Sequence, residues 1–477
     1  MRRLPVAVPA LLALLLVGGC DDIDVGDLNN PGLENLQDSP TRTGVLTLAT
    51  GLQIGSRYTM GNQNGYMVLL GILGREVYNF DAADPRFVTE MMLGPLDGGS
   101  PAFGGNLYQP FYANIRTGNI LLRAMDNLTP TDALNGLTPE ERAGLRAYVL
   151  TMQAYDYLRV IDTRDANGLP LDVDIDPTGP PAAIASKADV FARIISMLDE
   201  AATLLGGPAT FSFGFSPGFA GFDTPAGFLQ FNRGLRARVA AYQQDWAGLQ
   251  TALAASFISP AAPQAAPMPT AADLARGVYH SFSTTAGDSL NNLFDPTARA
   301  IVAHPSLGPD AQLRPGGEPD LRFTTKTALL GTPKSAQGLT SDRAMNVYTS
   351  PSAGVPIIRN EELLLLRAEA NIQQNNLGAA LNDINAVRQV SGGLAPLAGF
   401  ADQAAALTEL LYNRRYSLMF EGHRWIDLRR YNLLNLLPQD PTALGPALRF
   451  TKFPFPTNDC LARDTPPATG CTPEQGF

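Results

Sequence analysis

The fold of this chain is decided by residues 413–430, which read NRRYSLMFEGHRWIDLRR. Glu421 and Arg424 are three residues apart, as are Asp427 and Arg430, so each pair can meet on one helix surface. Such a cluster of charges invites a catalytic interpretation. We instead predict a structural role, in which the charges orient a helix against neighbouring loops. The charged members are Arg414, Arg415, Glu421, Arg424, Asp427, Arg429 and Arg430.

Two more helices are predicted before this stretch, at residues 360–372 and 377–387. Asn360 can cap the first helix, and the two glutamates after it lie where a helix dipole favours negative charge. Apolar residues recur at helical spacing in both segments. Because the break between them is short, the two helices should form an antiparallel hairpin. A serine followed by two glycines, from Ser391, ends the second helix.

Helical periodicity also dominates the first half of the chain, and strand signals are few, so the sequence predicts a mainly α protein. Helix starts are marked by capping residues at Thr138, Ser186 and Thr224, two of them followed by proline. The intervening stretches are too long for simple connections. The predicted helices cover about residues 112–125, 138–155, 186–205 and 224–242, and the loop-rich stretches cover about 60–110 and 258–356.

Residues 359–370 and 380–388, together with residues 413–430, resemble the SusD/RagB family of outer-membrane nutrient-binding lipoproteins. The last segment is similar to the family's ERR-x-EL-x-x-EG-x-RW-x-DL-R block. The chain departs from that block at Asn413 and Ser417, where glutamate is usual, and these departures cost an ion pair or two. The remaining match is long and specific.

The resemblance implies a SusD-like helical body, with tetratricopeptide-like helix hairpins that carry long irregular loops. We expect one such domain over residues 31–477, with hairpins at about 110–257 and 359–437 and ligand-facing loops at about 60–110 and 258–356. The resemblance also implies docking on a SusC-like TonB-dependent transporter. The family's structural motif falls on Arg414, Arg415, Glu421, Gly422, Arg424, Trp425, Asp427 and Arg430.

The N-terminus has the parts of an export signal: two arginines, an apolar run to Val17 and a junction of two glycines before Cys20. The run is short for a membrane span and contains two prolines. The junction looks like a bacterial lipobox, so residues 1–19 would be a lipoprotein signal peptide and Cys20 would carry the lipid. Residues 20–30 would form an acidic tether. An ordinary secreted protein is the alternative. Together, the lipobox and the family resemblance predict a lipid-anchored protein of the cell outer membrane that faces the exterior.

Composition argues against several other classes of function. A net charge of -10 and a pI of about 4.9, with no run of basic residues, do not favour nucleic-acid binding. Three histidines do not favour a histidine-based metal site, and the G-x-S-x-G signature of serine hydrolases is absent, so we expect no cofactor and no metal. Outside the cytoplasm, Cys460 and Cys471 should form a disulfide that staples the C-terminal tail, with half of a zinc site as the alternative.

Candidate ligand-binding residues are sought where aromatic rings and polar side chains mix in the loops. Rings can face the apolar patches of a sugar, while polar side chains bind its hydroxyls. The alternative is that the aromatics pin the loops to the core. The first candidate set is Arg75, Tyr78, Asn79, Phe80, Asp81, Phe103 and Tyr108, and the second is Tyr279, His280 and Phe282. A glycine-interrupted phenylalanine run over residues 211–231 is predicted to pack a loop or contact the transporter.

The predicted function is capture of an oligomeric nutrient, with glycan ahead of peptide, and its delivery to an outer-membrane transporter without breaking a bond. Peptide binding is an alternative because RagB-type family members serve peptide uptake. A surface glycosidase is the contrasting enzyme class, and Asp81, Asp84 and Glu90 are carboxyl groups that it could use. A transporter scaffold with no ligand of its own is a third possibility.

Overall fold

The computed structural model describes residues 36, 39–100, 103–129, 134–173, 179–264, 266–463 and 470–477. The predicted signal peptide, the lipidation site Cys20 and the acidic tether lie outside these ranges. Within the described ranges, no helix combines the length and apolarity that crossing a membrane requires.

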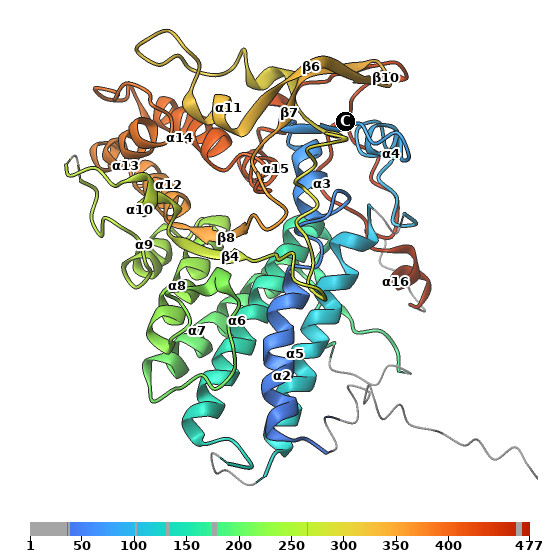
Figure 1. The fold of residues 1–477 in the computed structure, drawn as a ribbon, viewed down its shortest axis with the longest axis vertical. Coiled ribbons are helices and arrows are strands. Elements are labelled where there is room, and N and C mark those ends of the chain that lie inside the picture. The colour runs from blue at the N-terminus through green and yellow to red at the C-terminus, as the bar shows by residue number, and fades with distance from the viewer. Residues whose placement is uncertain are drawn as a thin grey trace, which may run out of the picture.

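The lower body of the molecule is a stack of antiparallel helices (Figure 1). Helices α2, α5 and α6 lie side by side, and α6 packs on α7, α7 on α8 and α8 on α9. All of these helices except α5 begin after a residue whose side chain caps the first turn; at α6, Thr138 and Glu141 form a capping box, as predicted. The bounds are α2 Arg42–Ser56, α5 Gln109–Asn127, α6 Pro139–Arg164, α7 Lys187–Gly206, α8 Pro225–Tyr242 and α9 Trp246–Ala254.

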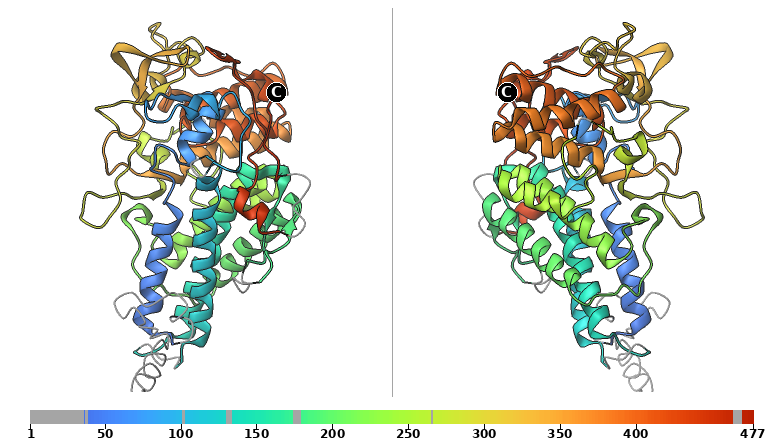
Figure 2. Two further views of the ribbon diagram at one scale, coloured as in Figure 1. Left: turned by 90° about the vertical axis from the view of Figure 1, so that its right-hand side faces the viewer. Right: turned by 90° about the vertical axis from the view of Figure 1, so that its left-hand side faces the viewer.

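A second group of helices continues this stack, and the two side views in Figure 2 show it above the first group. Helix α12 contacts α8 and α9 on one side and α13 and α14 on the other. The predicted hairpin is confirmed, and its turn includes Asn375 with φ at 60°. The bounds are α12 Asn360–Gln373, α13 Leu377–Val390, α14 Gln403–Ser417 and α15 Arg424–Arg430.

Strands β6, β7 and β10 and the short helices α3, α4 and α11 lie in the upper part of the molecule (Figure 1). A four-stranded antiparallel sheet has the order β1-β5-β7-β6, and β4 pairs with β8 in a separate ladder. The main strands are β1 Val77–Asn79, β4 Gly277–His280, β5 Ile301–Ala303, β6 Thr327–Ala336, β7 Leu339–Met345 and β8 Val355–Arg359. Two-residue strands pair as β2 Leu169–Pro170 with β3 Ile184–Ala185 and as β9 Pro441–Thr442 with β10 Gly445–Pro446. The short helices are α3 Tyr66–Leu73, α4 Arg86–Thr89, α10 Ala271–Ala275, α11 Leu321–Lys326 and α16 Thr457–Leu461.

The mainly α class is confirmed, and two local predictions need correction. Residues 60–110 and 258–356 are not simply irregular, because they supply the whole four-stranded sheet and the wholly buried helix α3. Asn360 does not cap α12 but is its first residue. Its amide instead donates to the carbonyls of Ser259 and Asp273, which ties an incoming loop to the helix.

Candidate ligand-binding groove

The helix pair α14–α15 is held by buried charges. Nε of Arg414 lies 2.7 Å from Oδ2 of Asp427, and Oδ1 of Asp427 lies 2.9 Å from Arg430. Arg430 also pairs with Glu369 on α12, where its Nη2 lies 2.8 Å from Oε2. Burial raises the pKa of Asp427, but the charges of Arg414 and Arg430 outweigh it and hold that pKa below its ordinary value. These residues therefore lock three helices together, as the predicted structural role requires.

One predicted pair does not form. Glu421 lies 2.9 Å from Arg359 at the end of β8, and Nε of Arg424 donates to the carbonyl of Gly74. The reason is that α15 begins only at Arg424, so Glu421 is outside the helix that the i,i+3 spacing assumed. Gly422 turns the chain there with φ at 79°, a conformation that favours glycine.

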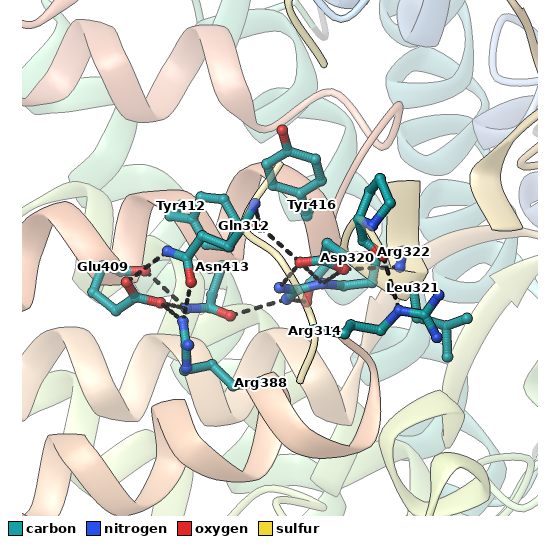
Figure 3. Close-up of polar contacts among 12 residues, drawn as sticks. Gln312, Arg314, Asp320, Leu321, Arg322, Arg388, Glu409, Tyr412, Asn413 and Tyr416 are labelled. Carbon is teal, nitrogen blue, oxygen red and sulfur yellow. Dashed lines mark hydrogen bonds and ion pairs between the residues drawn. The ribbon is translucent and has the colours of Figure 1, made fainter. Parts of the chain in front are cut away.

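Arg322 at the start of α11 faces Asn413, one of the two positions where the sequence departs from the family pattern (Figure 3). It donates to Oδ1 of Asn413 at 3.0 Å and to Oγ of Ser417 at 2.9 Å. Its negative partner is Asp320, 2.6 Å away and fully buried. Tyr412 also donates to Asp320. The ion pair that a glutamate on α14 would make is thus supplied from the loop before α11.

An open groove of about 520 Å³ lies between α2 and α5. Tyr58 lies just after the C-terminal end of α2 and is 66% exposed. Asn106 comes from the turn before α5, and Gln109 is the first residue of α5. The lining is Leu48, Gly51, Gly55, Tyr58, Asn106, Gln109, Pro110, Ala113, Asn114 and Thr117.

A polar cluster lies beneath this groove. The Asn114 amide nitrogen is 2.6 Å from Oδ2 of Asp156 and 2.9 Å from Oγ of Ser56. Burial raises the pKa of Asp156 to about 8, against the effect of these hydrogen bonds and of the Arg159 charge. Asp156 is therefore mainly protonated at neutral pH. The groove presents amides, a hydroxyl and one aromatic ring on a floor with little net charge.

The region from β6 onward matches a known family model: residues 326–465 match that of the SusD family. A SusD-like carbohydrate binding protein from Bacteroides fragilis is 16% identical, and the alignment covers 90% of this chain and 99% of that one with a TM-score of 0.66. A SusD superfamily protein from Bacteroides vulgatus is 16% identical over 91% and 99% of the two chains, with a TM-score of 0.65. Residues 326–465 thus resemble the SusD family, and the chain as a whole has the fold of the SusD-like structures.

One further solved structure that is similar to this chain is described as a laminarin binding SusD-like protein. It is 16% identical over 88% of this chain and 98% of its own, with a TM-score of 0.61. A comparison with curated protein sequences gives no match. At this level of identity the likeness of the solved structures concerns the fold.

Most of the first candidate set lies in the core. Arg75 is 1% exposed and donates to the carbonyls of Pro438 and Leu448. Tyr78 stacks on Phe80 with ring centroids 5.4 Å apart. Phe80 and Asp81 keep partial exposure. The buried members are Arg75, Tyr78, Asn79, Phe103 and Tyr108.

The second candidate set lies around β4. His280 is 3% exposed, and its Nε2 lies 2.9 Å from the hydroxyl of Tyr155. Burial lowers the pKa of His280 to about 3, so the ring is neutral. Phe282 is buried beneath the guanidinium of Arg57, and Tyr279 is partly exposed at a separate cavity. The alternative interpretation, that such aromatics pin loops to the core, matches where most of these rings lie.

The phenylalanine run packs as a cluster against α6 and α8, where Phe213 and Phe228 both contact the ring of Tyr148. Sequence reasoning missed the groove residues Tyr58, Asn106 and Gln109. One signal was available, because Gly51 and Gly55 are four residues apart and leave one face of α2 without large side chains. Separately, Cys460 and Cys471 are joined in a disulfide, as predicted.

Proposed function

We propose that this SusD-like protein captures an oligomeric nutrient, a glycan, in the groove between α2 and α5 and delivers it to a TonB-dependent transporter. The observation that carries the proposal is Tyr58, whose ring is 66% exposed beside the amide side chains of Asn106 and Gln109. An exposed aromatic ring offers a face to the C–H groups of a sugar, and amides both donate to and accept from hydroxyls.

The size of the groove supports the same proposal. Its volume of about 520 Å³ lies within the range of small-ligand sites. Binding without bond cleavage is supported by the lining, because the residues that line the groove include no carboxyl group. Glycosidases use a pair of carboxyl groups on either side of the scissile bond.

Anchoring through Cys20 is part of the proposal. The tether would reach the folded body near Arg42, at the opposite end of α2 from Tyr58. The test is mass spectrometry of the intact protein from its native envelope. Diacylated or triacylated Cys20 in the wild type, and a soluble Cys20→Ser variant, are the expected results. An unmodified Cys20 in a membrane-free wild type overturns the anchoring.

The test of glycan binding is isothermal titration calorimetry of residues 21–477 against β-1,3-glucan, α-1,4-glucan and peptide oligomers. Tyr58→Ala should weaken binding about tenfold, which is ~1.4 kcal/mol. Leu329→Ala is the matched control, because Leu329 on β6 is also 66% exposed and lies outside the groove lining. An equal loss for both variants contradicts the groove as the site.

The same titrations separate the alternative functions. Saturable heat with peptides alone favours a peptide-binding family member, and steady heat from turnover favours a glycosidase. If no oligomer gives measurable heat and a TonB-dependent barrel co-purifies from native membranes, the results favour a transporter scaffold without a ligand of its own. Delivery to the transporter requires that barrel to co-purify with the wild type, and its absence overturns the delivery step.

A further inference from the structure

The carboxamide of Asn114 is held in one orientation by α2 and α6. Its nitrogen Nδ2 lies 3.1 Å from the carbonyl oxygen of Leu52, 2.9 Å from Oγ of Ser56 and 2.6 Å from Oδ2 of Asp156. A backbone carbonyl can only accept a hydrogen bond, so it requires the NH₂ group on its side. Turning the amide over would set two oxygens against each other at Leu52. The oxygen Oδ1 must therefore face the other way.

The position of Oδ1 is shown by the glycine beside it. A Cβ atom added to Gly55 would lie 1.9 Å from Oδ1 of Asn114, and both residues line the groove. Asn114 itself is only 4% exposed. Among the described residues, no group donates a hydrogen bond to Oδ1, whereas Nδ2 has three acceptors. Oδ1 is thus an unpartnered acceptor at the floor of the groove, in the space that Gly55 leaves open.

We infer that Oδ1 of Asn114 is a fixed hydrogen-bond acceptor for a ligand hydroxyl, and that Gly55 keeps this acceptor reachable. The inference rests on the proposed function and names the specificity determinant within that groove. A ligand that presents a hydroxyl at this point satisfies the oxygen. A ligand that lacks the hydroxyl leaves a desolvated acceptor unpaired and is discriminated against.

The chain contains a matched pair of positions for the test. Gly51 and Gly55 are one helical turn apart on α2, and both line the groove. A Cβ on Gly51 meets nothing within 4 Å, whereas one on Gly55 must displace the Asn114 amide. Gly51→Ala and Gly55→Ala therefore add the same methyl group to the same groove, and only the second disturbs Oδ1.

The experiment is calorimetry of both variants with the oligosaccharide that the wild type binds, drawn from the β-1,3-glucan and α-1,4-glucan series. We expect Gly55→Ala to have a Kd more than tenfold weaker than that of Gly51→Ala, which adds the same methyl group to the groove without touching Oδ1. Equal affinity of the two variants overturns the inference and leaves the proposed function standing. A wild type that binds no oligosaccharide overturns the glycan proposal, and the inference falls with it.

A second measurement changes the ligand, and its deciding result comes from the wild type. Singly deoxygenated versions of the same oligosaccharide are titrated into the wild type and into Gly51→Ala. Removal of one particular hydroxyl should weaken binding about tenfold for both proteins. In Gly55→Ala, whose acceptor is already disturbed, removal of the same hydroxyl should cause little further loss of affinity. If every deoxygenated version binds the wild type as well as the parent does, the inference is wrong.

Discussion

The guanidinium of Arg322 donates a 3.0 Å hydrogen bond to Oδ1 of Asn413, which stands where the family block that residues 413–430 resemble has a glutamate. The missing negative charge is supplied by Asp320, only two residues from Arg322 along the chain. Asp320 and Arg322 are at most 2% exposed, so the pair is shielded from water. The ion pair is thus relocated from α14 to the loop before α11, and the helix contact survives as a neutral hydrogen bond.

We expect a carboxylate at position 413 to replace the one at position 320 as the ion-pair partner of Arg322. Asp320→Asn leaves a buried guanidinium without its charge partner, and we expect a loss of about 3 kcal/mol in the free energy of unfolding. Asn413→Glu alone should also destabilise, because Nδ2 of Asn413 lies 2.7 Å from Oε1 of Glu409, where a second carboxylate would be repelled. In the double variant the new glutamate can pair with Arg322.

The measurement is urea denaturation of the two single variants and the double variant. The double variant should be more stable than the sum of the single losses predicts by at least about 1 kcal/mol. Additive losses would show that the acid cannot be moved between these positions.

Asp156 should make the protein less stable as the pH rises. Its pKa is raised to about 8 by burial, above the ordinary value near 4 in an unfolded chain. Its contribution to stability is therefore fully present below about pH 4 and is lost as the pH rises through about 8. Asp156→Asn, which stays neutral, should flatten the fall in unfolding free energy between pH 5 and 8. An unchanged pH slope in this variant contradicts the raised pKa.

Gly422 should not tolerate a side chain. Its φ is 79°, and an added Cβ would lie 2.9 Å from the ring of Tyr66. Gly422→Ala should therefore cost about 1–3 kcal/mol of unfolding free energy. Gly378→Ala is the control, because Gly378 lies in α13 and an added Cβ there meets nothing within 4 Å; it should be neutral or stabilise by about 0.5–1 kcal/mol. Thermal melting that ranks the two variants the other way would be a clear refutation.

The disulfide between Cys460 and Cys471 should stabilise the docked tail. In the chain-entropy account, closing a loop of this length contributes about 3 kcal/mol. The tail is also held by backbone pairing, from Phe455 to Gly470 and between Leu96 and Glu474. We expect a lower Tm for the wild type in reductant, equal to that of a Cys460→Ser, Cys471→Ser double variant in either condition. A wild-type Tm that is insensitive to reductant, with loss of the bond verified by mass spectrometry, would contradict this.

Helix positions were predictable from the sequence because capping is local. Thr138, Ser186 and Thr224 each accept from a backbone N–H three residues later, so a few adjacent letters decide the start of a helix. The charged block was predictable as structural for a similar reason. The partner of Glu421 was not, since Arg359 at the end of β8 reaches it through the tertiary fold, where it also donates to the carbonyl of Ser417, rather than by spacing along one helix.

The candidate site was far less predictable. Arg75 and Tyr58 both lie in polar, glycine-containing sequence, and nothing local says which one is buried. Arg75 is buried because carbonyls at Pro438 and Leu448, more than 360 residues away in the chain, accept its hydrogen bonds. Tyr58 stays exposed because glycines on α2 leave a groove beside it. Both outcomes depend on contacts between distant segments, which a single sequence does not display.

The buried indole of Trp425 has a spectroscopic consequence. The chain contains only two tryptophans, Trp246 and Trp425, and neither lines the groove. Trp425 is 0% exposed and donates to the carbonyl of Phe450, which anchors the C-terminal segment. Its fluorescence should therefore shift to longer wavelength when the α14–α15 region opens and stay constant when a ligand occupies the groove. Intrinsic emission thus reports unfolding of this protein separately from saturation of its ligand site.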